Sequence, residues 1–186
     1  AARSCGFRSI NIDLIYGLPH QSVASFERTI ERTLEASPDR IALYSYAHLP
    51  ERFKPQRRID ATALPSAEEK LAIMAMSVEH LTRAGYVAIG MDHFAKATDD
   101  LAVALQQGHL QRNFQGYSTH PDCDLLGIGL TAIGKVGPAY AQNCREIGDY
   151  YDALDRGVAP VQRGIELSPD DLLRRAVIMA LMCQFS

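Results

Sequence analysis

Long apolar runs and an excess of positive charge are both absent from this sequence of 186 residues. No run approaches the roughly 18 consecutive apolar residues of a membrane-spanning helix, and no basic-then-apolar leader of the secretory kind opens the chain. The formal net charge of −3 offers no basic surface to nucleic acid or to an anionic membrane. We therefore expect a cytoplasmic globular protein with neither kind of partner.

Cysteine is sparse, and its spacing limits the kinds of site that it can form. A chain of this length can bury a core without disulfides, so free thiols in a reducing cytosol are expected. No C-x3-C-x2-C or similar compact set occurs, so the chain cannot hold an iron–sulfur cluster by itself. His120 and Cys123 are suitably spaced for a metal, but two further ligands would have to come from elsewhere, and we assign no metal ligand. The four cysteines are Cys5, Cys123, Cys144 and Cys183.

Three common catalytic signatures are also missing: the G-x-S-x-G turn, the P-loop and the H-E-x-x-H motif. Residues 127–132 match the G-x-G-x-x-A dinucleotide fingerprint, but Gly134, Gly137 and Pro138 would break the helix that must follow. Close approach of the backbone, to a ligand or to packing, explains these glycines better.

Both ends of the sequence look like the interior of a helix. Residues 1–7 resemble a last helical turn ended by Gly6. Residues 168–171 form a strong helix start, and the apolar run behind them reaches Ser186 without a stop signal. We therefore expect a fragment of a longer protein.

Strand-like and helix-like segments alternate in the first half of the chain. Apolar residues at helical spacing follow a cap at Ser22, and a capping box begins at Ser66. This alternation predicts a parallel α/β sheet with right-handed crossovers, either doubly wound or a barrel. The expected strands are 9–16, 41–47 and 87–92, and the apolar stripe of the second helix comprises Leu71, Met74, Ala75, Val78 and Leu81.

Beyond Ala95 the pattern changes, which indicates an elaboration covering the sheet rather than more of the same repeat. The expected elements are a helix at 101–107, a strand or hairpin at 110–119, a glycine-broken apolar stretch at 125–140 and a helix at 146–156.

Strand alternation places Asn11, Asp13 and Ile15 on one face, and the opposite, apolar face should meet the helices. Asp13 should then point into a barrel or crevice, and Asp92 sits at a matching place in the third strand. Ligand sites gather at the C-terminal ends of parallel strands, so two such acids favour a site. The alternative is a pair of buried acids satisfied by backbone N–H groups or an arginine.

Two neighbouring features are harder to assign. His93 is adjacent to Asp92 on a strand, so the two should face opposite ways, and a hydrogen-bonding role at the strand end is expected for His93. Residues 112–117 mix donors with aromatics, which suits a planar, carboxylate-bearing ligand or a structural turn.

Four strings in the chain resemble one family, the oxygen-independent coproporphyrinogen III oxidases of radical-SAM type. The first is shared with related radical-SAM proteins, including heme-chaperone paralogues, whereas the Met-Asp-His-Phe and Asn-Phe-Gln-Gly-Tyr strings point to the oxidases. The resemblance runs from Phe7 to Phe185. The four strings are Asn11–Pro19, Tyr46–Pro50, Gly90–Ala95 and Arg112–Tyr117.

The resemblance implies an α/β fold: the second half of an incomplete parallel (β/α) barrel, followed by a mixed α+β elaboration. The half-barrel would span 1–97, the covering elaboration 98–167, and the start of a truncated helical domain 168–186. The family uses a [4Fe–4S] cluster and two S-adenosylmethionine (SAM) molecules to convert two propionates of coproporphyrinogen III to vinyls, which yields protoporphyrinogen IX. The cluster ligands would precede Ala1, so this chain alone should be inactive.

Four positions match family residues that bind SAM. Asp13 matches an acid that contacts its polar groups, Ile15 an apolar neighbour of the adenine, Ala47 a backbone position facing the adenine, and Ile133 a contact to the second SAM. Residues 96–99 fit the family less well. No catalytic residue, substrate contact or electron acceptor is assigned, and we expect the full-length protein to be a monomer.

There are two alternative functions. A heme- or tetrapyrrole-binding module without turnover, like the chaperone paralogues, is the main alternative. An unrelated barrel enzyme such as an aldolase is disfavoured, because the three clear strands carry no lysine at their ends.

Overall fold

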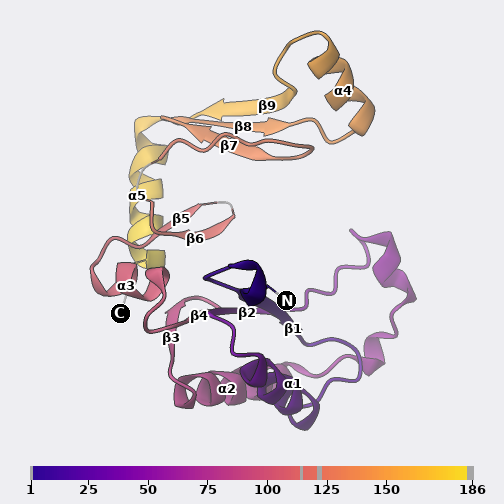
Figure 1. Ribbon diagram of the computed structural model, residues 1–186. Helices are drawn as coiled ribbons and strands as arrows, with labels where there is room; N and C mark the ends of the chain where they lie inside the picture. Colours follow the sequence, from indigo (N-terminus) through magenta and orange to yellow (C-terminus); the bar gives the residue numbers. More distant parts are fainter. Residues whose placement is uncertain (1, 114, 121–122, 184–186) are drawn as a thin grey trace. The chain divides into compact units, whose positions relative to one another are not determined.

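The computed structural model describes residues 2–113, 115–120 and 123–183 (Figure 1). The chain forms two compact units, residues 1–106 and 107–186. The boundaries expected between half-barrel, elaboration and helical domain, at 97/98 and 167/168, stay predictions. Within the described residues, no helix combines the length and the apolar character needed to cross a membrane.

The first unit is an α/β layer structure, as the sequence predicts. Its four-stranded sheet has the order β1-β2-β4-β3, and β1 and β2 are parallel. Its strands are β1 (Asn11–Tyr16), β2 (Arg40–Ser45), β3 (Tyr86–Gly90) and β4 (His93–Lys96). Its helices are α1 (Val23–Ala36), α2 (Ala67–Arg83) and α3 (Asp100–Gln106), with 3-10 turns η1 (Arg3–Cys5), η2 (Lys54–Arg58) and η3 (Ala61–Ala63).

The sheet is mixed, so the prediction of a purely parallel sheet is wrong. β4 lies between β2 and β3 and is antiparallel to both. The third predicted strand, 87–92, ends early because Gly90 and Met91 have φ values of 156° and 49°, which turn the chain back into a hairpin. β3 still runs in the same direction as β2, as a crossover through α2 requires.

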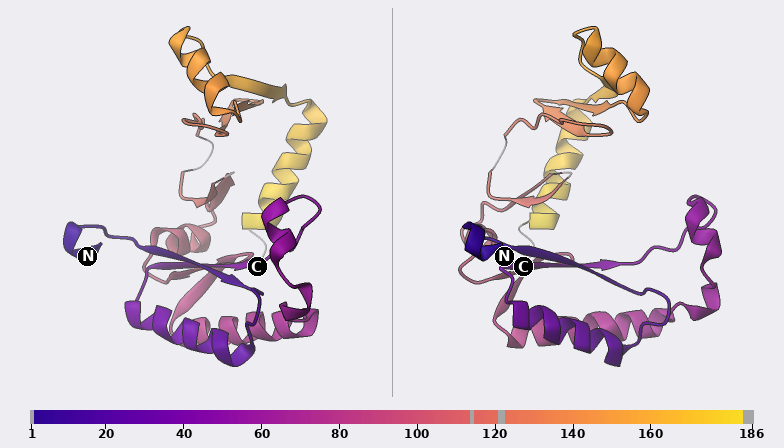
Figure 2. Two further views of the ribbon diagram at one scale, coloured as in Figure 1. Left: turned by 90° about the vertical axis from the view of Figure 1, so that its right-hand side faces the viewer. Right: turned by 45° about the vertical axis from the view of Figure 1, so that its right-hand side comes forward.

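Helices α1 and α2 lie side by side on one face of this sheet (Figure 2). The predicted stripe of α2 is partly wrong: Leu71 is 71% exposed, and the fully buried positions are Ile73, Ser77 and Leu81. The Ser77 hydroxyl donates to the Ile73 carbonyl at 2.7 Å, which satisfies a polar group inside the core. The buried core comprises Phe26, Ile30, Ile41, Leu43, Ile73, Leu81, Tyr86 and Phe94.

Serine caps begin both helices where the sequence predicts them. Ser22 forms a reciprocal capping box with Ser25. Ser66 accepts from the Glu69 N–H at 3.1 Å, but the Glu69 carboxylate accepts from the Val23 N–H at 2.9 Å. Glu69 therefore links the first turns of α1 and α2.

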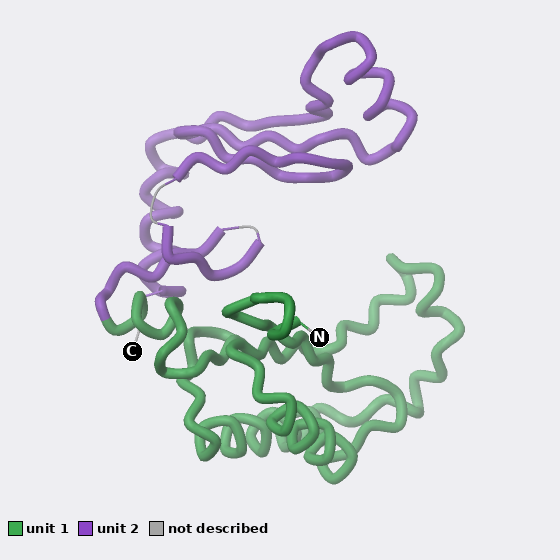
Figure 3. The backbone as a smooth tube through the Cα atoms, viewed as in Figure 1, with its two compact units in different colours: residues 1–106 green, residues 107–186 purple. Residues whose placement is uncertain are grey.

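Among its described residues, the second unit (purple in Figure 3) forms two antiparallel sheets and two helices. The predicted hairpin at 110–119 and helix at 146–156 are confirmed as β5–β6 and α4. β9 was not predicted, because all six of its residues are exposed and show no apolar alternation. The elements are β5 (Gln111–Asn113), β6 (Gly116–Ser118), β7 (Ile133–Val136), β8 (Ala139–Asn143), α4 (Ile147–Asp155), β9 (Val161–Glu166) and α5 (Pro169–Cys183).

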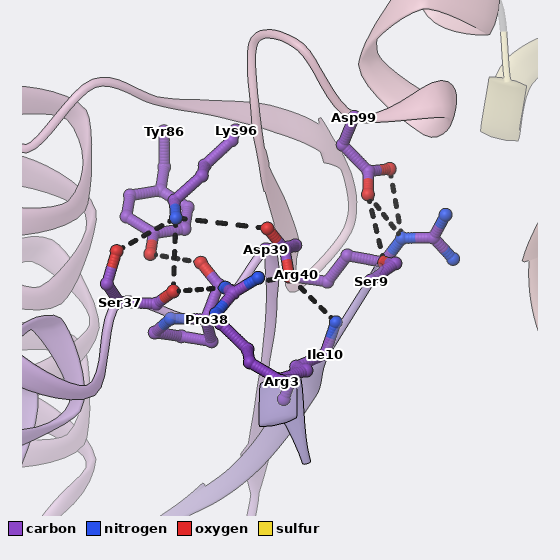
Figure 4. A network of polar contacts seen from close by, with 10 residues as sticks. All are labelled: Arg3, Ser9, Ile10, Ser37, Pro38, Asp39, Arg40, Tyr86, Lys96 and Asp99. Atoms are coloured by element: carbon purple, nitrogen blue, oxygen red, sulfur yellow. Dashed lines mark hydrogen bonds and ion pairs between the residues drawn. The ribbon is translucent and has the colours of Figure 1, made fainter. Parts of the chain in front are cut away.

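A polar network around Asp39 lies at the N-terminal end of β2 (Figure 4). Its carboxylate accepts from the Ile10 N–H at 2.8 Å and from the Arg3 guanidinium at 3.0 Å. Burial alone would raise the pKa of Asp39, but the Ile10 N–H and the charges of Arg3 and Lys96 together lower it below its usual value. The ends of strands opposite the ligand side usually serve stability, and we assign this network to that role.

Asp99 completes the network from the start of α3. Its side chain is 4% exposed, and it accepts from Arg40 Nε at 2.9 Å and from the Ser9 hydroxyl at 3.1 Å. It also accepts from the Leu101 N–H at 2.9 Å, which caps the helix. Asp99, in the segment that fits the family less well, therefore has a structural role.

Candidate functional site

The face of the first sheet opposite α1 and α2 carries the predicted polar residues. Asn11, Asp13 and Ile15 are exposed on this face, whereas Leu14 and Tyr16 pack against the core, as strand alternation predicts. Asn11 Nδ2 donates to Asp13 Oδ1 at 2.6 Å. A carboxylate accepts through both oxygens, so Asp13 retains the capacity to bind hydroxyl or ammonium groups of a ligand.

The strand register brings two further side chains to the same face. Asp13 pairs with Ala42, which in turn pairs with His93, and Ile15 pairs with Tyr44. The rings of Tyr44 and His93 meet edge to face, with centroids 6.0 Å apart. The small side chain of Ala42 therefore lies between Asp13 on β1 and His93 on β4.

Asp92 and His93 are arranged differently from the prediction. Asp92 lies in the turn between β3 and β4 rather than on a strand, so it does not match the place of Asp13. His93 Nδ1 and Asp92 Oδ1 are 2.8 Å apart, so the two do not face opposite ways. The hydrogen-bonding role expected for His93 at a strand end is confirmed.

Ala47 lies two residues beyond β2 and is exposed. Gln56 holds this segment: its Nε2 donates to the Ala47 carbonyl at 3.0 Å, and its Oε1 accepts from the Leu49 N–H. Among the backbone–backbone hydrogen bonds of the described residues, none is donated by the Ala47 N–H. Ala47 is therefore an exposed position in a segment whose backbone Gln56 restrains.

Lys70 connects the C-terminal ends of β1 and β2. Its Nζ donates to the Tyr46 carbonyl at 3.3 Å. Its side chain lies over Gly17, where an added Cβ would meet Lys70 Cε at 2.8 Å, and Gly17 has a φ of 86°. No local sequence pattern marks Gln56 or Lys70, because each acts on backbone atoms distant in sequence.

Ile133 belongs to the second unit, where it opens β7 and is half-buried. The glycine-rich segment before it is held by buried Asn143, whose Nδ2 donates to the carbonyls of Gly127 and Gly129 at 3.0 and 2.9 Å. A Cβ on Gly134 would lie 2.9 Å from the Leu125 carbonyl oxygen. Close backbone approach is therefore confirmed for Gly127 and Gly134, whereas Gly129 meets no atom within 4 Å and instead has a φ of 103°. Strand β7, not a helix, follows these glycines.

The hairpin at 112–117 is both a structural turn and a cavity wall. The Arg112 guanidinium lies over the Tyr117 ring, 5.3 Å from its centroid. Arg112, His120 and Cys123 line a cavity of about 670 Å³ in the second unit. Phe114 of the hairpin and residues 121–122 between His120 and Cys123 lie outside the described residues.

Metal binding and disulfide formation have little support in the structure. No group of three or more His, Cys, Asp or Glu side chains within the described residues is placed to hold a metal ion. The four cysteines are free thiols, and they are distributed over both units.

Comparison with known proteins identifies close relatives along the whole chain, although no protein-family model matches it. An oxygen-independent coproporphyrinogen III oxidase from Pseudomonas aeruginosa is 52% identical over 185 residues, which make up 100% of this chain and 40% of that protein. The Escherichia coli oxidase is 50% identical over 184 residues and 40% of its length. The Thermostichus vulcanus oxidase is 52% identical, and the chain covers 57% of it.

A solved structure agrees with these relatives. It is described as coproporphyrinogen III oxidase from Escherichia coli, a radical SAM enzyme, and it matches 99% of this chain with a TM-score of 0.95 and 50% identity. The chain covers 42% of that structure and about 40% of the Pseudomonas aeruginosa and Escherichia coli oxidases. It is therefore homologous along its length to part of such an oxidase.

Proposed function

We propose that this chain is part of an oxygen-independent coproporphyrinogen III oxidase, a radical SAM enzyme of porphyrin and heme biosynthesis. The observation that carries this proposal is about 50% identity along the whole chain with relatives of that name, combined with a TM-score of 0.95 to one of them. The reaction would be the oxidative decarboxylation of coproporphyrinogen III to protoporphyrinogen IX. The four-stranded sheet would contribute the second half of an incomplete (β/α) barrel.

The open sheet face fits one end of a SAM molecule. Asp13 offers carboxylate oxygens to hydroxyl or ammonium groups, and Ile15 beside it is 46% exposed, which suits contact with an adenine ring. The Ala47 N–H would donate to a ring nitrogen of the adenine. Asn11 and Gln56 would orient Asp13 and Ala47 through the hydrogen bonds described above.

Ile133 would contact a second SAM molecule. The supporting feature is the rigid backbone before it, because Asn143 and the close contact at Gly134 leave little freedom to residues 127–134. Such a segment can present backbone groups to a ligand at a fixed position.

The cluster ligands would lie outside this chain, because its four cysteines form no compact set. When bound, SAM and the cluster would supply the radical that removes one hydrogen atom from each reacting propionate, which then loses carbon dioxide and one electron and becomes a vinyl group. This chain would bind and orient the cofactor and would show no turnover alone. Free cysteines also agree with a cytoplasmic location.

Replacement of Asp13 tests the SAM site. In the full-length protein, Asp13→Ala should raise the dissociation constant for SAM about tenfold or more, as measured by calorimetry. Asp100→Ala, which removes an exposed acid at the start of α3, is the control and should leave binding unchanged. Equal SAM affinity in Asp13→Ala and the unmodified protein would contradict the assignment.

Turnover separates the oxidase from a tetrapyrrole-binding paralogue. The full-length, cluster-loaded protein should convert coproporphyrinogen III anaerobically in the presence of SAM, a reductant and an electron acceptor, whereas this chain alone should not. Tight heme binding without conversion would instead favour the chaperone-like alternative.

A further inference from the structure

None of the four residues proposed to contact SAM lines the cavity in the second unit. Its volume of about 670 Å³ lies within the ~300–1,000 Å³ range of small-molecule sites. The β5–β6 hairpin, residues 123–125, the β7–β8 hairpin and α5 form its walls. All four walls belong to one unit, so the cavity is defined by that unit alone.

Positive charge is concentrated in this cavity. The basic residues Arg112, Lys135 and Arg175 line it. Among its described lining residues, Asp124 is the one with an acidic side chain. Asp124 Oδ1 already accepts from the Gly137 N–H at 2.8 Å. The whole chain has a net charge of −3, so a cationic cavity is a local feature rather than a consequence of overall composition.

One face of α5 provides an apolar wall next to these cations. Arg175, Ile178, Met179 and Met182 follow the spacing i, i+3, i+4 and i+7, which places them in a row along the helix. Apolar surroundings strengthen the attraction between a guanidinium and an anion. Methionine side chains adapt to irregular apolar ligands.

Arg112 lies on the hairpin wall and is held in place by Tyr117 of the same hairpin. Its guanidinium stacks on the Tyr117 ring, and the Tyr117 hydroxyl donates to the Met182 carbonyl at 3.2 Å, which connects the hairpin to α5. The buried Arg112 Nε has no hydrogen-bond partner in the described part of the chain. A buried guanidinium N–H without an acceptor is costly, and a carboxylate is the acceptor that matches it best.

We propose that this cavity binds propionate carboxylates of the tetrapyrrole substrate, with Arg112, Lys135 and Arg175 facing the carboxylates and the methionine wall facing a pyrrole ring. The inference rests on the proposed function and deepens it, because it assigns substrate contacts to the second unit. A ligand with carboxylates on an apolar ring system combines the two properties of the cavity, its cations and its apolar wall.

The test compares neighbouring arginines on α5 in the full-length protein. Arg175→Gln removes a cavity cation, and Arg174→Gln is the matched control, since Arg174 is exposed and pairs with Asp170 at 2.7 Å. The probe is coproporphyrin III, the aromatic form of the substrate, which does not react and whose fluorescence reports binding. Arg175→Gln should raise its dissociation constant about tenfold to a hundredfold, and Arg174→Gln should leave it unchanged.

Two further measurements keep the outcome interpretable. Thermal unfolding shows whether each variant is folded. If Arg175→Gln does not fold, Lys135→Gln takes its place as the cavity variant. SAM affinity, measured by calorimetry, distinguishes substrate carboxylates from the carboxylate of SAM and should be the same in all variants. In turnover, Arg175→Gln should raise KM while kcat changes little.

Unchanged coproporphyrin binding in a folded cavity variant would overturn the proposal, and so would a loss of SAM binding of equal size. Failure of the proposed function gives a different result. In that case the unmodified, cluster-loaded protein would not convert coproporphyrinogen, while the coproporphyrin titration would still decide whether the cavity binds a tetrapyrrole carboxylate.

Discussion

The Glu69 carboxylate, in the first turn of α2, accepts a hydrogen bond from the Val23 N–H that opens α1, at 2.9 Å. A capping box within α2 would have used the same carboxylate locally. The observed bond instead satisfies an N–H at the start of another helix. One acid thereby links the first turns of the two helices that cover the sheet on the face opposite Asp13.

Removal of this link should destabilise the first unit. Glu69→Ala is expected to lower the free energy of unfolding by about 1–2 kcal/mol, because the Val23 N–H loses its acceptor. Glu69→Gln keeps an acceptor oxygen and should cost less than half of that. Urea unfolding measures both, and an Ala variant as stable as the Gln variant would contradict the role assigned to Glu69.

Local signals in the sequence correctly predict where α1 and α2 begin and which residues of β1 lie on the open face of the sheet. Serine caps marked the starts of α1 and α2, and strand alternation placed Asp13 and Ile15 on the open face. β4 and β9 were missed because their positions depend on strand pairing distant in sequence and, for β9, because exposed residues show no periodicity. The same alternation rule misplaced Asp92, since it assumed a strand where Gly90 and Met91 form a turn.

The supporting residues of the site were outside the reach of sequence patterns. Gln56, Lys70 and Asn143 all bond to backbone carbonyls 9 to 24 positions away. Such contacts leave no motif, because the partner is the main chain and places no demand on residue type. Ala47 and Ile133 were named through the family resemblance, and residue chemistry alone would not have identified them.

The Asp39 network should make stability depend on pH. In the folded protein the pKa of Asp39 is lowered by the Ile10 N–H, Arg3 and Lys96. The stabilising contribution of its carboxylate is therefore present above the unfolded pKa of about 3.9. This contribution is lost as the pH falls through the lower folded value. Asp39→Asn should therefore be less stable than the unmodified protein at neutral pH, and the difference should shrink toward pH 3. Urea unfolding from pH 7 to pH 3 checks this, and a constant difference would argue against the assignment.

Glycine replacements should distinguish close packing from open surface in the second unit. Gly134→Ala places a methyl group 2.9 Å from the Leu125 carbonyl oxygen, and the resulting shift should cost about 1–3 kcal/mol. Gly148→Ala, in α4, meets no atom within 4 Å and should stabilise the helix by about 0.5 kcal/mol. Thermal unfolding of the two variants should show opposite changes, and similar effects would contradict the packing argument.

Asn143 should be sensitive to loss of its donor rather than to loss of size. Asn143→Asp keeps the shape of the side chain, but an ionised carboxylate cannot donate to the carbonyls of Gly127 and Gly129 and would itself be buried. The free energy of unfolding should fall by about 2 kcal/mol or more.

Asn113→Asp is the matched control: Asn113 is exposed, and its oxygen accepts from the Gln115 N–H at 2.8 Å, a bond that Asp preserves. If the segment before Ile133 also contributes to a SAM site, Asn143→Asp should weaken SAM binding in the full-length protein while Asn113→Asp leaves it intact. Equal stability of the two variants would show that the Asn143 amide does not hold the segment.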